Sequence, residues 1–193
     1  MFKAYLGLFV FGCFLSAQPT CNKCSGTYVA NEEMQAYLKR VEGQAVADQQ
    51  VRALDIGKTN VDIAVVYRGK LDAPGKQSVA EHDKVSEVYH IIDGTATLMT
   101  GSDIVDLKPR PADDRAVRLL NGPGGNGVSI RNGATYQLKA GDVVVIPAGV
   151  GHLFTKIDDH IRYLMVRIDP DKIAPLKDEA ASKADLASGG KNN

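Results

Sequence analysis

Residues 141–156 read GDVVVIPAGVGHLFTK, and this stretch decides the fold. An opening Gly-Asp pair turns the chain into a short, fully apolar strand. Pro147 ends that strand because proline has no N–H to donate to a sheet ladder. Gly149 and Gly151 then permit a tight reversal at backbone angles that other residues resist. His152 opens the next strand, where its imidazole is able to point into the interior of a β-structure.

The sequence around this stretch has a period of two, which is typical of strands. Residues 61–67 alternate apolar side chains on one side, and further short runs are rich in β-branched and aromatic residues and bounded by turn residues. Many short strands with little helix between them predict an antiparallel sandwich or closed barrel. The other runs lie at residues 87–93, 95–100, 134–140, 142–148, 152–157 and 161–168.

One helix is expected before the strands. Residues 31–43, NEEMQAYLKRVEG, place acidic residues in the first turn and basic residues in the last turn. Asn31 is a suitable N-cap and Gly43 is able to end the helix. A less regular segment follows, and residues 50–56, QVRALDI, are a strand candidate that we expect to cross to the sheet of a partner chain in a homodimer.

The chain divides into four segments. Residues 1–17 combine one Lys, a short apolar run and small residues at its end, which is typical of a secretory signal peptide. Residues 18–55 form a lead-in and helix, and residues 56–172 form the β-domain. Inside that domain, residues 102–133 are a long loop rich in Pro and Gly, either a functional lid or mobile decoration. Residues 173–193 are a polar tail, read as a weak helix that frays into disorder.

The signal-like segment predicts a secreted or periplasmic protein with no stable membrane insertion after its removal. Cys21 and Cys24 follow it in the sequence CNKC. Zinc normally needs four ligands and no second such pair is present, so a local disulfide or two incidental thiols is the favoured interpretation. Lys plus Arg equals Asp plus Glu, at 23 each. This balance gives no argument for binding to nucleic acid or to an anionic membrane.

Residues 141–156 resemble the second signature of the cupin superfamily, G-x5-P-x-G-x2-H-x3-N. Every fixed position matches except the last, where Lys156 replaces Asn. The stretch HDKVSEVYHIIDG, residues 82–94, resembles the end of the first cupin signature, G-x5-H-x-H-x3-4-E-x6-G. The resemblance covers roughly residues 60–168 and implies a small β-barrel, the jelly-roll-like double-stranded β-helix.

The cupin resemblance also implies a metal site. In the aligned signatures, His82, Glu87 and His152 take ligand places, while the first His place falls on Ala80, which cannot bind a metal. Two imidazoles and one carboxylate suit Fe(II) and also accept Mn, Ni, Co or Zn. Three protein ligands leave positions open for water or substrate. The alternative is a lapsed site. His160 is expected to be a surface turn residue.

Strand parity sorts the neighbours of Glu87. If its side chain faces inward, Tyr89 does as well, while His90 faces the other way and is expected to be packed or hydrogen-bonded instead of bound to metal. For Tyr89 the alternatives are core packing and a catalytic role in acid–base chemistry or substrate orientation. Arg162 and Arg167 have opposite parity on the last strand, so at most one of them points inward.

Two functions remain open. The first is a secreted metal-dependent enzyme that acts on a small organic molecule as an oxygenase, or as an isomerase or lyase with the metal as Lewis acid. The second is a non-catalytic domain that binds or senses a small ligand. Ala80 and Lys156 favour the second function, whereas the retained ligand set favours the first. The fold by itself does not choose, because one fold hosts many functions.

Overall fold

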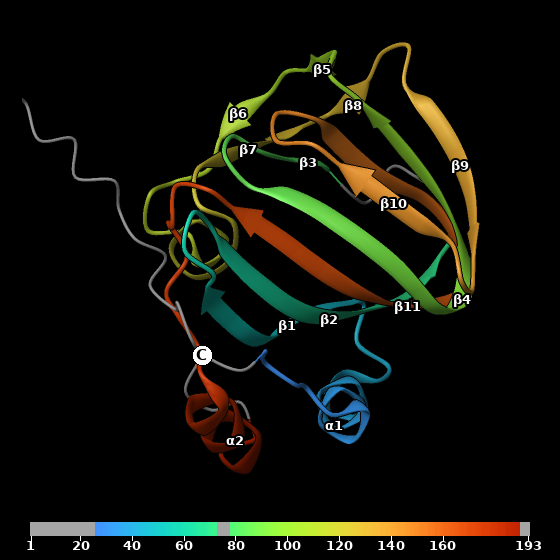
Figure 1. Cartoon of the computed structure of the whole chain (residues 1–193). Helices are drawn as coiled ribbons and strands as arrows, with labels where there is room; N and C mark the ends of the chain where they lie inside the picture. The colour runs from blue at the N-terminus through green and yellow to red at the C-terminus, as the bar shows by residue number, and fades with distance from the viewer. Residues whose placement is uncertain (1–25, 73–77, 190–193) are drawn as a thin grey trace, which may run out of the picture.

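A computed structural model of the chain describes residues 26–72 and 78–189 (Figure 1). The expected signal peptide, residues 1–17, and the Cys21/Cys24 pair lie outside these residues. Within the described part, no helix is both long enough and apolar enough to cross a membrane.

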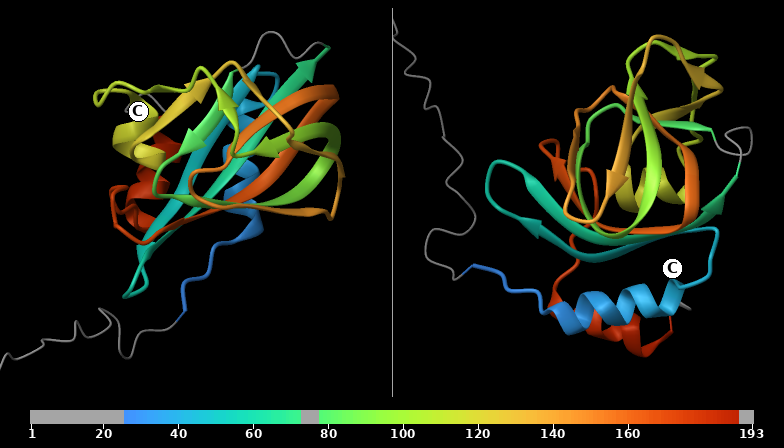
Figure 2. Two further views of the ribbon diagram at one scale, coloured as in Figure 1. Left: turned by 90° about the horizontal axis from the view of Figure 1, so that it is seen from above. Right: turned by 90° about the vertical axis from the view of Figure 1, so that its right-hand side faces the viewer.

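The described residues fold into a nine-stranded antiparallel sheet that curls over itself and a small two-stranded sheet, and the predicted mainly β, jelly-roll-like fold class with an N-terminal helix is confirmed. Across the described residues the strand pairing does not close the sheet into a barrel. Helices α1 (Asn31–Val41) and α2 (Glu179–Ala187) lie together under the outer face of β1 and β2, opposite the smaller strands (Figures 1 and 2).

Pairing follows the order β1-β2-β11-β3-β7-β6, while β4 pairs with β9, β10 and β11, and β5 pairs with β8. The strands are β1 (Val46–Asp55), β2 (Asn60–Leu71), β3 (Val79–His82), β4 (Ser86–Gly101), β5 (Ile104–Val105), β6 (Lys108–Pro109), β7 (Gly124–Gly127), β8 (Ser129–Ile130), β9 (Ala134–Lys139), β10 (Val143–Ile146) and β11 (Gly151–Asp169).

Two pairs of expected short strands are in fact single long strands. β4 spans the runs at 87–93 and 95–100, and β11 spans those at 152–157 and 161–168. At the two positions where turns are predicted, the strands continue with an irregular pairing. These positions lie opposite each other, where the register of β4 with β11 shifts. Gly94 has φ +81°, and a Cβ on it would lie 2.1 Å from the carbonyl oxygen of His160. Only glycine fits this crossing of the two strands.

The sharp turn before His152 uses its two glycines differently. Gly149 has φ +78°, as the sequence predicts. Gly151 is not left-handed, and its role is close packing, since a Cβ there would lie 2.8 Å from both Ile104 and Val79. The absent side chain lets β5 pack against the start of β11.

Helix α1 begins one residue earlier than the sequence predicts. Asn31 is the first helical residue, and Ala30 occupies the N-cap position without a side-chain hydrogen bond. Gly43, with φ +82°, follows the helix end as expected. Tyr37, Leu38 and Val41 bury the inner face of α1 against the sheet.

The strand candidate at 50–56 belongs to β1, which pairs along its length with β2 of the same chain. Its outer edge is partly covered, because Ala53 and Lys177 exchange two backbone hydrogen bonds of 3.0 Å. Within its own chain the strand therefore has pairing partners along one edge and at Ala53 of the other, and its crossing to a partner chain stays a prediction.

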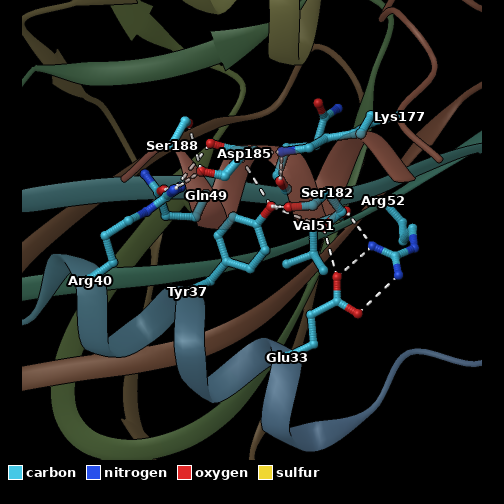
Figure 3. A network of polar contacts seen from close by, with 12 residues as sticks. Glu33, Tyr37, Arg40, Gln49, Val51, Arg52, Lys177, Ser182, Asp185 and Ser188 are labelled. Carbon is cyan, nitrogen blue, oxygen red and sulfur yellow. Dashed lines mark hydrogen bonds and ion pairs between the residues drawn. The ribbon is translucent and has the colours of Figure 1, made fainter. Parts of the chain in front are cut away.

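The polar tail holds α2 against α1 through a compact network (Figure 3). The hydroxyl of Tyr37, which is fully buried, lies 2.9 Å from the Ser182 hydroxyl and 3.1 Å from the Asp185 carboxylate. Asp185 also accepts hydrogen bonds from Arg40 at 3.1 Å and from Lys177 at 2.5 Å. The contacts of Tyr37 and Arg40 join positions about 145 apart in sequence, and they order a segment that its composition assigns to a weak, frayed helix.

Candidate metal centre

Three strands bring the three expected ligands together inside the curled sheet. His82 ends β3, Glu87 lies near the start of β4, and His152 lies at the start of β11. One ligand atom from each side chain lies within 4.8 Å of the others. Nε2 of His82 is 3.3 Å from Oε1 of Glu87, and Nε2 of His152 is 3.6 Å from Oε2. Ala80 is the pairing partner of His152 on β3, so its methyl group adds no donor.

Glu87 is 2% exposed and its carboxylate has cationic and polar neighbours. Burial raises the pKa of Glu87, but His82, His152 and Arg167 together outweigh burial and hold that pKa well below its usual value. Because a buried carboxylate is costly to leave without compensation, the position of Glu87 between two imidazoles favours a cation there.

His152 is 5% exposed and suited to ligation. Burial lowers its pKa to about 4, with His82 and Arg68 acting in the same direction and Glu87 opposing them. A neutral imidazole has a lone pair to give to a metal. Two nitrogen donors and one carboxylate within mutual reach thus fit a divalent first-row cation, whose identity the donor set does not fix.

Tyr89 faces inward beside Glu87, while His90 on the same strand is exposed. The Tyr89 hydroxyl donates a 2.6 Å hydrogen bond to Oε2 of Glu87. Burial, and then the Glu87 charge, raise the pKa of Tyr89 well above its ordinary value, so the phenol remains protonated. This geometry lets Tyr89 orient the carboxylate, as hydrogen bonds to ligand side chains do at metal sites.

Of the two arginines on β11, only Arg167 points inward. It is fully buried, forms an ion pair with Asp48, and places Nε 3.6 Å from Oε1 of Glu87. Arg162 lies on the outer face, where it pairs with Asp93.

His160 is not the turn residue that the sequence predicts. It lies within β11, and its ring has an aromatic and a carboxylate neighbour. The ring stacks on Tyr67 at a centroid distance of 5.9 Å, and Nε2 lies 3.1 Å from Asp93. The adjacent bulge explains the error, because the sequence KIDD has the composition of a turn but here widens a continuous strand.

Two residues of the long loop reach the site, and sequence reasoning missed both. Nδ2 of Asn121 lies 2.9 Å from Nε2 of His82, and Arg110 lies 3.4 Å from Nδ1 of the same ring. Asn121 ends a π-helical turn, η2 (Val117–Asn121). The length of the loop and its density of Pro and Gly left two alternatives, a functional lid and mobile decoration, and no residue type or spacing singled out these two positions.

The ligand set borders a cavity of about 220 Å³. Its wall includes the half-buried Arg68, whose Nε donates a 3.1 Å hydrogen bond to the Tyr163 hydroxyl. Arg110 also borders the cavity, together with Ala116, Leu120 and Asn121 of the long loop. Sheet strands therefore supply the ligands, and the loop supplies the opposite wall.

Comparison with known proteins gives a family-model match and distant structural likenesses. The model of the AraC-like ligand binding domain matches residues 124–186, and no curated protein matches the chain. A Bacillus halodurans protein gives a TM-score of 0.42 at 13% identity, over 81% of this chain and 93% of that one.

Two further solved structures show a similar level of likeness. DMSP lyase DddQ from Ruegeria pomeroyi gives a TM-score of 0.38 at 17% identity, over 64% of this chain and 46% of that one. The EutQ protein of Clostridium difficile gives 0.37 at 15% identity, over 65% and 69%. The family model covers the chain from β7 into α2, including His152, and the resemblance to the cupin superfamily is confirmed.

Proposed function

We propose that the protein is a metal-dependent enzyme acting on a small organic molecule, with His82, Glu87 and His152 as metal ligands. One observation carries the proposal. A buried carboxylate and two buried imidazoles converge within 4.8 Å beside a cavity, a placement that exposes a bound cation to a small substrate.

The residues around the ligands have distinct tasks. Tyr89 and Arg167 hold Glu87 from two sides and fix its orientation. Arg68 and Arg110 add positive charge to the cavity wall, which favours an organic anion such as a carboxylate. A volume of about 220 Å³ limits that anion to a small molecule. When bound, the metal supplies Lewis-acid polarisation or, as Fe(II), oxygen chemistry.

A non-catalytic ligand-binding domain is the second candidate. The match to an AraC-like ligand binding domain over residues 124–186 favours it, because that description refers to binding alone. The methyl group of Ala80 in place of an imidazole favours it as well. In this alternative the same cavity holds a small anion, and the cation is structural or absent.

The first experiment measures bound metal in protein purified without a His tag. Elemental analysis is expected to show close to one divalent cation per chain, and His152→Ala is expected to lose most of it. The variant should also melt earlier than wild type in metal-replete buffer and at a similar temperature after chelation. His90→Ala removes an exposed imidazole on β4 and serves as the matched control. Wild type without stoichiometric metal, and with a melting temperature unmoved by chelation, would overturn the proposed metal centre.

A second experiment separates the enzyme from the binding domain. Metal-replete protein is incubated with a panel of small mono- and dicarboxylates, with and without oxygen, and products are followed by mass spectrometry. Turnover that disappears in His152→Ala supports the enzyme. Saturable binding by calorimetry with no product formation supports the binding domain.

A further inference from the structure

The carboxamide of Asn121 is buried, and only one of its two polar atoms has a hydrogen-bond partner among the described residues. It is 6% exposed and lies at the end of η2, in the long loop. Its Nδ2 contacts the His82 ring, whereas its Oδ1 has no hydrogen-bond partner among the described residues. Buried amide oxygens in proteins are nearly always paired, so an orphaned one calls for an explanation. π-Helical turns also occur frequently at functional sites.

The carboxamide of Asn121 lies beside the ligand position itself. It contacts Nε2 of His82 at 2.9 Å, and the same nitrogen is 3.3 Å from Oε1 of Glu87. The lone pair of that nitrogen accepts either an N–H or a metal, but not both. A cation bound to His82 therefore displaces the amide hydrogen, and half a turn of the carboxamide brings Oδ1 to the same place.

The lining of the cavity shows how a loop residue comes to lie beside the ligand position. Ala80 and Asn121 both border it, and Ala80 occupies the place where the cupin signature has an imidazole. The sheet thus offers three donors, and the long loop brings a fourth polar group to the side of His82.

We propose that Asn121 is a fourth protein ligand of the metal centre, bound through Oδ1. This inference rests on the proposed function, because it requires a cation at His82, Glu87 and His152. The resulting set has two nitrogen and two oxygen donors. Oxygen donors shift the preference of a site towards harder cations, so the set favours Fe(II) or Mn(II) over Cu(II) more than an imidazole at position 80 would.

Cobalt(II) titration of the chelated protein tests the proposal, because the visible absorption of Co(II) reports its ligands without any assay of activity. Asn121→Ala is expected to weaken Co(II) binding by roughly tenfold or more, in the range typical of lost groups around a metal, and to change the absorption band. Asn121→Asp keeps an oxygen donor and adds charge, so it is expected to bind Co(II) at least as tightly as wild type. Arg118→Ala, an exposed change in the same turn, is the matched control.

The outcomes separate the two proposals. If wild type binds no cation, the proposed metal centre fails and this inference fails with it. If wild type binds Co(II) and Asn121→Ala keeps both its affinity and its spectrum, only the inference is overturned. Melting curves of the metal-free variants show whether Asn121→Ala has a folding defect. If it has one, the Co(II) affinity of Asn121→Asp tests the inference instead. Its Co(II) affinity should equal or exceed that of wild type, and a tenfold loss would count against ligation.

Discussion

At the scale of single residues, Glu87 organises its surroundings. Its two oxygens are divided among neighbours, because Tyr89 donates to Oε2 while His82 and Arg167 face Oε1. Each neighbour comes from a different position on the sheet, so the carboxylate is fixed before any ligand arrives. Pre-orientation of this kind determines how tightly a metal site binds, and it makes the hydrogen bond from Tyr89 open to a direct test.

Tyr89→Phe is expected to lower metal affinity by roughly tenfold, because it removes the 2.6 Å hydrogen bond to Glu87 while the aromatic packing against Tyr163 remains. Competition with a chromophoric chelator measures the affinity. Tyr163→Phe is the control, since the Tyr163 hydroxyl pairs with Arg68. Equal losses in both variants would show that the effect is general and not specific to the carboxylate.

Asp62 provides a prediction of pH dependence away from the ligands. Burial raises its pKa to about 6, with Asp169 and Asp48 adding to the rise and Arg167 and Gln50 opposing it. The folded pKa lies above the unfolded value of 3.8. The free energy of unfolding therefore falls as pH rises from about 4 to about 6 and stays lower above that range.

Asp62→Asn is consequently expected to raise the free energy of unfolding at about pH 7.5, by up to about 3 kcal/mol, and to change it little at about pH 4. Urea denaturation at the two pH values measures the difference. Asp171→Asn, at a half-exposed carboxylate, should show no such dependence. A variant less stable than wild type at neutral pH would mean that the Asp62 charge is needed by Arg167.

At the scale of elements, the network between α1 and α2 decides whether the C-terminal segment is ordered (Figure 3). Asp185 is its centre, since it accepts from Tyr37, Arg40 and Lys177. Burial raises the pKa of Asp185, but the hydrogen bonds and charges of Lys177 and Arg40 prevail and lower it to about 2.

Asp185→Asn is expected to lower Tm by a few degrees at neutral pH, because both cationic partners lose their counter-charge. The folded pKa lies below the unfolded value of 3.8, so the stabilisation is present above about pH 4 and is lost as pH falls towards about 2. Differential scanning calorimetry measures the shift. Glu179→Gln alters an exposed i,i+4 pair on the same helix, where an effect near zero is expected. A shift of equal size in both variants would contradict the role given to the network.

At the scale of the whole molecule, β10 is the most exposed apolar part of the sheet. Val143 and Val145 are 60% and 63% exposed, and nearby Tyr136 on β9 is 45% exposed. Among the described residues, β10 pairs with β4 alone. An open, apolar strand edge is a template for pairing with another chain, and two copies of one strand pair antiparallel about a two-fold axis.

We therefore expect a homodimer formed through β10. Light scattering at micromolar concentration should give twice the mass of one chain. Val145→Asp should shift the protein towards the monomer, because a charge would be buried in the contact. Leu176→Asp changes a residue of similar exposure away from β10 and should leave the mass unchanged. A wild-type protein with only the mass of one chain would refute the dimer.

The sequence by itself determined the fold class and the three side chains that converge. Alternation along residues 61–67 and 161–168 depends only on which face of a strand is buried, so it is readable without the structure. The spacing of Glu87 from His82 and the turn before His152 are likewise local, and local constraints survive into the fold.

The tertiary structure alone decided what enters the site from a distance and how the strands join. Asn121 and Arg110 reach His82 because a long loop folds back over β3, and no periodicity records that path. The fusion of short runs into β4 and β11 depends on Gly94 meeting His160 across two strands. In each case the arrangement depends on a contact between residues far apart in sequence, and such contacts exist only once the chain has folded.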